Sequence, residues 1–154
     1  MNGTQGQLLS QHAMPPAKPN RGMVVGHGLD VVDVVEFGRL LSDSAQMFLD
    51  RYFTPAELAA AGNGAERTQR LAGRFAVKEA VMKALGTGWG NGVAFTDIEV
   101  VTLESGTPTL SLKRLMAEIE HERLISGWLV STSHTSSVAV ASVIAISDYN
   151  NQSI

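Results

Sequence analysis

The chain has 154 residues, 44% of them hydrophobic, which is enough for one domain with a buried core. It has no cysteine, so disulfides, zinc–thiolate centres and a cysteine nucleophile are excluded. Its 12 basic and 15 acidic side chains give a net charge of -3, whereas proteins that bind duplex nucleic acid usually carry a basic excess. No apolar run reaches the roughly 20 residues of a membrane helix, and no signal-peptide pattern is present. We therefore expect a soluble, cytoplasmic protein with no nucleic-acid or membrane partner.

The chain divides into a central domain and two polar ends. Residues 1–22 are rich in Gln, Asn, Gly and Pro and are predicted to be a flexible extension, and 148–154 a polar tail. Residues 23–147 form the predicted domain. Hydrophobic periodicity and turn signals predict, in order, a strand near 23–32, helices near 34–53, 55–62 and 66–85, a hairpin near 97–112, a helix near 112–124, and strands near 128–133 and 138–146. Helices and mostly antiparallel strands without βαβ alternation indicate the α+β class.

The first predicted strand contains one anomalous residue. Asp30 interrupts the apolar run at 28–32, where an unpaired buried carboxylate is costly. One interpretation is an aspartate that caps the next turn or faces water; the other is a functional carboxylate.

The helix near 66–85 is the most informative segment. At about 100° per residue, one stripe carries Arg67, Arg70, Arg74 and Lys78. Glu79 lies away from that stripe, four residues before Lys83, so these two side chains are neighbours. The stripe is either a solvated face or a phosphate-binding face. The Glu79–Lys83 pair is either an ordinary surface pair or a site for a Mg²⁺-bound phosphate, with Glu on the metal and Lys on a phosphate oxygen.

Two weaker patterns follow that helix. The glycine-rich segment 86–92 follows a helix rather than a strand and lacks a Gly-Lys-Ser/Thr run, so it is neither a dinucleotide fingerprint nor a Walker loop. Its glycines favour a sharp turn, and they also permit close approach of a ligand. The Ser and His residues at 131–137 lack a nucleophile elbow, so a Ser–His triad is not indicated.

Taken together, these segments resemble holo-acyl-carrier-protein synthase, the small class of 4′-phosphopantetheinyl transferases. The resemblance covers residues 23–146. It rests most strongly on the run Leu-Ala-Gly-Arg-Phe-Ala-Val-Lys-Glu-Ala at 71–80 and on Lys-Ala-Leu-Gly-Thr-Gly at 83–88. Matching segments also occur, in order and spacing, at 26–32, 94–100, 106–108 and 130–135. The match implies that family's fold, in which a small antiparallel sheet packs with a long central helix.

The resemblance also implies a reaction and a site. The 4′-phosphopantetheine arm of coenzyme A would pass to a serine of an apo acyl carrier protein in fatty acid biosynthesis, releasing adenosine 3′,5′-bisphosphate. Asp30 and Glu79 would bind Mg²⁺, and with Lys83 they would be the catalytic residues. The implied coenzyme contacts are Arg74, Lys78, Lys83, Gly86, Thr87 and Gly88. The implied assembly is a homotrimer with active sites between subunits, where the coenzyme touches a neighbouring copy.

Two departures from the family pattern keep other interpretations open. Leu129 stands where many members have a coenzyme-binding His. The helix near 34–53, which is commonly basic and docks the carrier, holds Glu36, Asp43 and Asp50. A less acidic carrier, or one fused inside a larger synthase, would fit this charge. The alternatives are a different Mg²⁺-dependent nucleotide enzyme on the same scaffold and a non-catalytic coenzyme or carrier-binding module with a decayed site.

Overall fold

The computed structural model describes residues 22–88 and 90–148. Its elements are β1 (Gly22–Asp33), α2 (Val34–Tyr52), α3 (Pro55–Ala61), α4 (Arg67–Leu85), the 3-10 turn η1 (Phe95–Asp97), β2 (Ile98–Thr102), β3 (Pro108–Leu112), α5 (Arg114–Glu122), β4 (Gly127–His134) and β5 (Val138–Asp148). The predicted strands and helices are all present, with ends shifted by a few residues. No helix in this part of the chain is long and apolar enough to cross a membrane.

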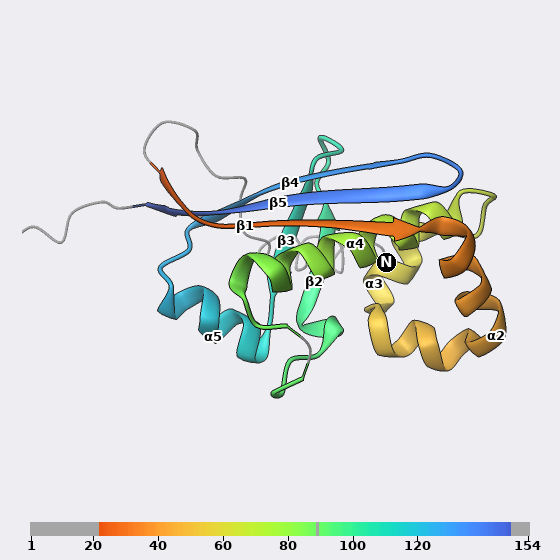
Figure 1. Cartoon of the computed structure of the whole chain (residues 1–154), viewed down its shortest axis with the longest axis horizontal. Coiled ribbons are helices and arrows are strands. Elements are labelled where there is room, and N and C mark those ends of the chain that lie inside the picture. The colour runs from red at the N-terminus through yellow and green to blue at the C-terminus, as the bar shows by residue number, and fades with distance from the viewer. Residues whose placement is uncertain (1–21, 89, 149–154) are drawn as a thin grey trace, which may run out of the picture.

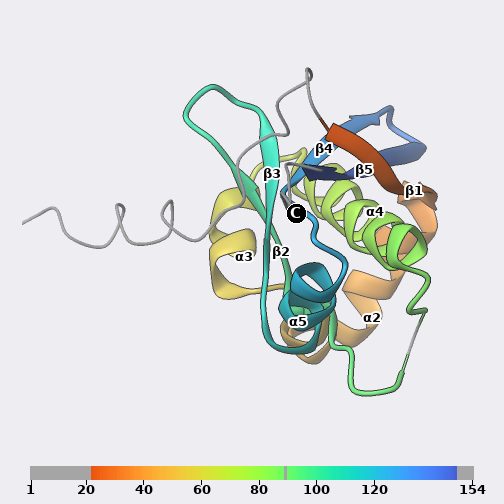
Figure 2. The ribbon, with the colours of Figure 1, turned by 90° about the vertical axis from the view of Figure 1, so that its left-hand side faces the viewer.

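Two antiparallel sheets flank the long helix α4, which confirms the α+β class. The three-stranded sheet has the order β1-β5-β4, and β2 and β3 form a separate hairpin. Helix α4 runs beneath the three-stranded sheet, with the hairpin on its other side (Figures 1 and 2). Gly22 pairs with Asp148 at the outer end of the sheet, so the sheet extends one residue beyond the predicted domain at each end. The rest of the predicted extension and tail lies outside the described residues.

Strand β1 crosses α4 at very short range. A Cβ atom at Gly28 would lie 1.8 Å from the carbonyl oxygen of Ala80, and one at Gly26 would lie 2.6 Å from that of Ala84. Only glycine has no Cβ, so only glycine permits this approach. The small side chains of α4, Ala76 and Ala80 among them, are fully buried there. These small side chains therefore allow the first strand of the same chain to pack closely against α4.

Aromatic side chains fill the space between α2, α4 and η1. Phe75 of α4 stacks on Phe95 of η1 with ring centroids 5.3 Å apart, and Tyr52 packs edge-on against both. Phe37 of α2 joins the same cluster. These contacts bury the side of α4 opposite the sheet and fix α2 across it. Leu40, by contrast, is 46% exposed, because it points away from this stripe of α2.

Candidate functional site

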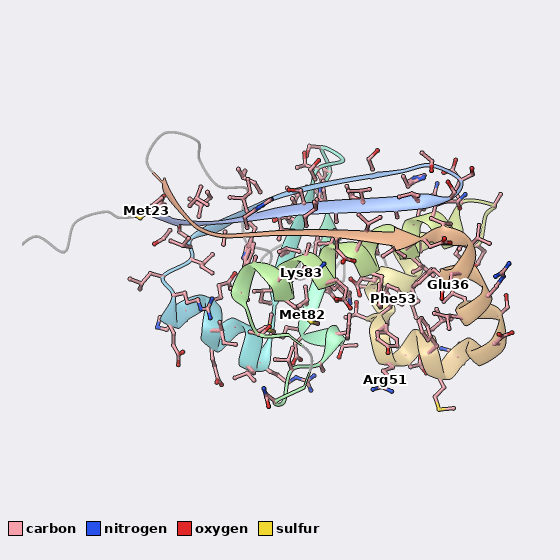
Figure 3. The ribbon with its side chains drawn as sticks, in the orientation of Figure 1. Met23, Glu36, Arg51, Phe53, Met82 and Lys83 are labelled. Atoms are coloured by element: carbon pink, nitrogen blue, oxygen red, sulfur yellow. The ribbon has the colours of Figure 1, made fainter. Side chains whose placement is uncertain are left out.

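Lys83 joins the first strand to the central helix. Its ammonium donates to the Asp30 carboxylate at 2.7 Å and to the Leu29 carbonyl at 3.0 Å. The Asp30 side chain is 14% exposed, whereas that of Lys83 is 54% exposed. Lys83 lies beneath the middle of β1 (Figure 3). The anomalous carboxylate in the apolar strand is therefore an ion-paired group at the edge of the β1–α4 crossing, and it does not cap the following turn.

The capping role belongs to Asp33 instead. Its carboxylate accepts from the Glu36 N–H at 2.9 Å and so begins α2. Glu79 lies one helical turn before Lys83 and is partly buried. At about 100° per residue it is on the same side of α4. The structure thus joins Asp30 to Lys83, and helical spacing puts Glu79 on the same edge of α4.

The donor set on this edge fits Mg²⁺. Within the described residues no group of three or more Asp, Glu or His side chains could hold a metal ion. Two carboxylates with open positions are what Mg²⁺ uses when substrate phosphates complete its octahedral shell. The Asp30 carboxylate already binds one cation here, the Lys83 ammonium. Asp30 and Glu79 are the residues that would hold the ion.

Lys78 does not lie with this group. Its side chain is completely buried, and its ammonium donates to the Glu57 carboxylate at 2.7 Å, the Tyr52 carbonyl at 2.7 Å and the Phe95 carbonyl at 3.1 Å. All three N–H groups are used. Lys78 is therefore a core residue, and the implied contact with a coenzyme phosphate is not available to it.

The remaining basic stripe divides between structural and open positions. Arg67 donates to the Gly62 carbonyl and, at 3.3 Å, to the Leu58 carbonyl, which closes the end of α3. Arg70 pairs with Glu66 one turn earlier at 3.1 Å. The stripe is thus neither a uniform solvated face nor a uniform phosphate-binding face. Arg70 and Arg74 both line a cavity, and Arg74 is the one without a carboxylate ion pair there.

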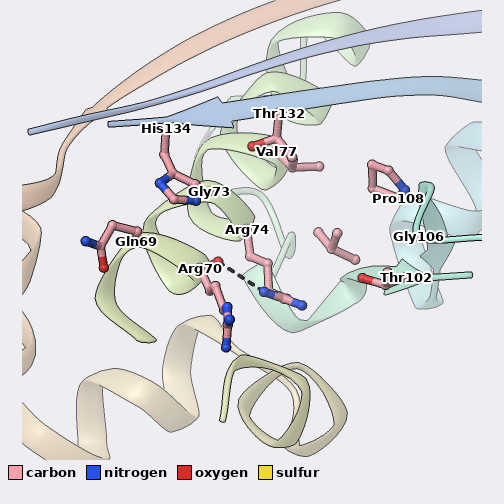
Figure 4. Close-up of a pocket in the computed structure, with 11 residues that line it drawn as sticks. Gln69, Arg70, Gly73, Arg74, Val77, Thr102, Gly106, Pro108, Thr132 and His134 are labelled. Atoms are coloured by element: carbon pink, nitrogen blue, oxygen red, sulfur yellow. Dashed lines mark hydrogen bonds between the residues drawn. The ribbon is translucent and has the colours of Figure 1, made fainter. Parts of the chain in front are cut away.

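That cavity, of about 270 Å³, lies between α4, β4 and the β2–β3 hairpin (Figure 4). It is lined by Gln69, Arg70, Gly73, Arg74, Val77, Val100, Thr102, Gly106, Pro108, Thr132 and His134. Two arginines and a histidine surround it, so its field favours an anion. The volume is near the lower end of ordinary small-ligand sites.

Arg74 has unused hydrogen-bonding capacity in this cavity. One of its terminal nitrogens donates to the Arg70 carbonyl at 3.1 Å, while its buried Nε has no partner in the described part of the chain. Burial lowers the pKa of Arg74, Glu57 partly opposes that effect, and Arg70 adds to it. An anionic ligand would supply the missing acceptor and a further counter-charge.

Gly86, Thr87 and Gly88 lie just past Lys83, at the end of α4. Gly86 is in the left-handed region with φ 63° and terminates the helix. Its N–H donates to the Lys83 carbonyl and that of Thr87 to the Met82 carbonyl. These two N–H groups are therefore used by the helix end. What this segment offers to a ligand is the buried Thr87 hydroxyl, which has no partner in the described part of the chain, and Gly88.

The two groups of candidate residues flank α4 on opposite edges. Measured from Ala80, which faces β1, Lys83 and Glu79 are turned by about 60–100° to one side, and Arg74 by about 120° to the other. The sheet covers the helix between them. One copy of the chain therefore presents the carboxylate–lysine edge and the arginine cavity to different sides.

Three residues of note carry no role in the sequence-based prediction. Thr132 and His134 line the arginine cavity because alternate residues of β4 face α4. Period-two alternation of that strand is the signal that would have found them. Glu57, the buried partner of Lys78, gives no such signal, because its sequence context indicates only a helix cap.

Comparison with known proteins decides the family. A model of the 4′-phosphopantetheinyl transferase superfamily matches residues 26–141. The chain belongs to this superfamily. Its matched span holds the β1–α4 crossing and both candidate edges. The resemblance inferred from the motifs is thereby confirmed.

The relatives within the superfamily are holo-acyl-carrier-protein synthases. The enzyme of that name from Solibacter usitatus is 38% identical over 122 residues, which are 79% of this chain and 98% of the relative. A crystal structure of the Neisseria meningitidis synthase has a TM-score of 0.73 at 32% identity, over 80% of this chain and 98% of that one. The Bacillus anthracis synthase in complex with CoA (3′,5′-ADP) has a TM-score of 0.67 at 35% identity, over 81% and 98%. The predicted fold is confirmed at this level.

Proposed function

We propose that this chain transfers the 4′-phosphopantetheine arm of coenzyme A to a serine hydroxyl of an apo acyl carrier protein, using Mg²⁺ held by Asp30 and Glu79. The observation that carries the proposal is the Asp30–Lys83 pair at the β1–α4 crossing, beside Glu79. Superfamily membership and the synthase relatives support the reaction class. The relative in complex with CoA (3′,5′-ADP) supports the coenzyme as co-substrate.

The reaction exchanges the phosphoanhydride bond of the coenzyme for a phosphodiester bond to the carrier serine. The carrier serine oxygen bonds to the phosphorus that bears pantetheine, the bridging P–O bond breaks, and adenosine 3′,5′-bisphosphate leaves with the second phosphate. The serine proton is lost to a base. Bound Mg²⁺ would neutralise charge on the pyrophosphate and on the leaving phosphate.

The side chains divide this work by charge and exposure. The Asp30 and Glu79 carboxylates would orient the metal. Lys83 is exposed enough to donate from its ammonium to a pyrophosphate oxygen, which stabilises the charge that develops on the leaving group. Arg74 would hold another phosphate of the coenzyme through its Nε and the cavity around it.

Mass spectrometry of the carrier tests the transfer directly. The chain is mixed with Mg²⁺, coenzyme A and an apo carrier protein of fatty acid synthesis, and the carrier is expected to gain the mass of one phosphopantetheine. Coenzyme A binding with no modified carrier, across several carriers, would refute the transfer and favour the non-catalytic module. Hydrolysis of coenzyme A without a carrier would favour a different nucleotide enzyme.

We further propose that the working particle is a homotrimer in which each site is shared. The Asp30 edge and the Arg74 cavity lie on opposite edges of α4, which suits sites built from the Asp30 edge of one copy and the Arg74 cavity of another. Apolar side chains on the outer face of the three-stranded sheet, Leu29, Val31 and Leu129 among them, are 41–60% exposed and would be covered by a second copy. Light scattering of the purified chain should give three times its mass.

Mixing two inactive variants tests the sharing of sites. Asp30→Ala removes one half of a site and Arg74→Ala removes the other. If neighbouring subunits build each site, a mixture that has exchanged subunits regains part of the activity, because some sites draw both intact halves from different copies. A mixture that stays inactive after exchange, verified by native mass spectrometry, would contradict a shared site.

The carrier is proposed to dock on α2, which continues directly from the Asp30 strand. The exposed face of α2 combines apolar side chains, with Met47 82% exposed, and acidic ones, including Asp43 and Asp50. This mixture suits a carrier that is less acidic than usual, or one tethered within a larger synthase. Asp43→Lys should lower the KM for a strongly acidic carrier while leaving the KM for coenzyme A unchanged. An unchanged carrier KM would place docking elsewhere.

A further inference from the structure

The buried pair of Lys78 and Glu57 connects five elements through one cluster of hydrogen bonds. Lys78 extends from α4 to the end of α2 at the Tyr52 carbonyl, to η1 at the Phe95 carbonyl, and to Glu57 of α3. Both partners are completely shielded from solvent. The cluster therefore anchors α4 from the side that faces away from the sheet.

Glu57 is held as firmly as its partner. One carboxylate oxygen accepts from the Val100 N–H of β2 at 2.9 Å, and the other accepts from the Thr54 N–H at 2.9 Å as well as from Lys78. The Glu57 N–H in turn donates to the Thr54 hydroxyl, which completes a capping box. The acceptor for Lys78 thus has a fixed position relative to its own helix cap and to β2.

Stability alone is a weak explanation for such a pair. Burial lowers the pKa of Lys78, and the nearby Glu57 opposes this only in part. Apolar side chains of similar volume often stabilise a core as well as, or better than, a buried ion pair does. What an apolar pair does not provide is a set of directional bonds with one geometry, which is a role documented for buried polar groups in some other proteins.

That geometry acts on the residue next to Lys78. Glu79 follows it directly, about 100° further round the helix, on the edge where Lys83 contacts Asp30. A rotation or shift of α4 that displaces Lys78 from its three acceptors also displaces Glu79 from the Asp30 side. We propose that the Lys78–Glu57 pair is a positioning device that fixes the rotation and height of α4 and so places Glu79 for metal binding. This rests on the proposed metal-binding role of Asp30 and Glu79.

The test removes the pair without leaving one charge buried alone. The double variant Lys78→Met with Glu57→Gln keeps both side-chain lengths and keeps an acceptor for the α3 cap. Mn²⁺ serves as a spectroscopic substitute for Mg²⁺, and its binding in the presence of coenzyme A is measured by electron paramagnetic resonance. Val81→Ala is the matched control, because Val81 is a fully buried residue of the same helix outside the cluster.

We expect the double variant to bind Mn²⁺ about 10- to 100-fold more weakly, as when groups that orient a ligand are lost. Its kcat should fall with little change in the KM for coenzyme A, and Val81→Ala should lose thermal stability with unchanged Mn²⁺ affinity. Wild-type Mn²⁺ affinity in the folded double variant, or an equal loss in Val81→Ala, would overturn the proposal. If the double variant does not fold, Glu57→Asp, which keeps both charges and draws the acceptor back by one methylene, is measured in the same way.

Failure of the underlying function gives a different result. If Asp30 and Glu79 do not bind the metal, Asp30→Asn leaves Mn²⁺ binding unchanged in the otherwise native chain. If they bind it and the buried pair has no positioning role, Asp30→Asn weakens binding and the double variant does not.

Discussion

Two lysines of α4, five residues apart, each contact a carboxylate at 2.7 Å, yet their surroundings differ completely. Lys83 and Asp30 meet at the protein surface, where the lysine is more than half exposed. Lys78 and Glu57 meet where no solvent reaches. An exposed ammonium can exchange its carboxylate for a phosphate at low cost, whereas a buried one cannot leave its partner without stranding a charge. The difference in burial therefore makes the Lys83–Asp30 pair suitable for binding a ligand and the Lys78–Glu57 pair suitable for holding elements together, although both are lysine–carboxylate pairs.

The largest expected effect comes from removing the charge at the exposed pair. Asp30→Asn keeps the side-chain shape and an oxygen acceptor for Lys83, but it removes a proposed metal ligand. Transfer should fall by about 10³-fold, the upper range for losing one preorganised electrostatic group, while the thermal midpoint changes little. Holo-carrier formation is followed by mass spectrometry. Asp33→Asn is the control, because asparagine caps a helix as well as aspartate does, and it should retain transfer. Near-normal transfer in Asp30→Asn would remove Asp30 from the site.

The next largest effect comes from separating the strand and helix that carry the exposed pair. In Gly28→Ala the new Cβ would lie 1.8 Å from a backbone carbonyl, so β1 and α4 must move apart. Overpacking of this kind costs about 1–3 kcal/mol, and transfer should fall with it because the Asp30–Lys83 contact spans the same crossing. Calorimetry and the transfer assay measure both losses. Gly64→Ala, where nothing lies within 4 Å of the added Cβ, should show neither loss. A stable and active Gly28→Ala would mean that the close crossing is not required.

A smaller loss is expected when only the exposed cation is removed. Lys83→Met deletes the ammonium and keeps most of the side-chain length, so transfer should fall about 10- to 100-fold, the value of one hydrogen bond to a charged group. Most of the change should appear in kcat if Lys83 acts on the leaving phosphate. Lys113→Met, which alters an exposed lysine paired with Glu99 at 3.4 Å, is the control and should keep full activity. Equal losses in both variants would indicate a general charge effect.

The smallest effect concerns Glu120 of α5, a partly buried carboxylate that accepts a hydrogen bond from a neutral indole. Glu120 accepts from the Trp128 indole at 2.7 Å; burial raises its pKa above the usual 4.5, and the indole bond partly lowers it. The folded state then holds this proton more tightly than the unfolded chain, so this group's contribution to stability declines as pH rises from about 4.5 through the folded-state value. Glu120→Gln stays neutral and still accepts from Trp128. The thermal midpoint of Glu120→Gln should increase relative to that of the wild type as pH rises above about 4.5. Glu118→Gln, on the exposed side of α5, is the control and should show no such pH-dependent difference. A difference that does not depend on pH would contradict this account.

Much of the fold could be predicted because its signals are local. The capping pattern that begins at Thr54 and the stop at Gly86 mark helix ends through backbone geometry that neighbouring residues determine. The short segment at 134–137 between two strand-like runs predicts the pairing of β4 with β5 for the same reason. Such features depend on a few consecutive residues, so they can be predicted directly from the sequence.

The candidate site depended on contacts between distant residues. Asp30 stands out because a carboxylate in an apolar strand needs a partner, but its partner lies 53 positions away. The pairing of Lys78 with Glu57 is equally hidden: Lys78 shares a helical stripe with Arg74, and only the packing of α3 and η1 over one end of that stripe buries it. Periodicity predicts which residues share a face, whereas burial of that face depends on where other elements pack.

The junction between β1 and α2 has a mechanical consequence. Asp33 ends the strand and Val34 begins the helix with no loop between them, and the Val34 N–H donates to the Ser137 carbonyl at 2.9 Å. Because no residues intervene to absorb a change in backbone angles, we expect strand β1 and helix α2 to move as one rigid unit. A carrier that displaces the first turns of α2 on docking would therefore also displace Asp30, which lies only three residues before the junction. On the proposed function, this junction would fix the distance between a carrier docked on α2 and the Asp30 carboxylate.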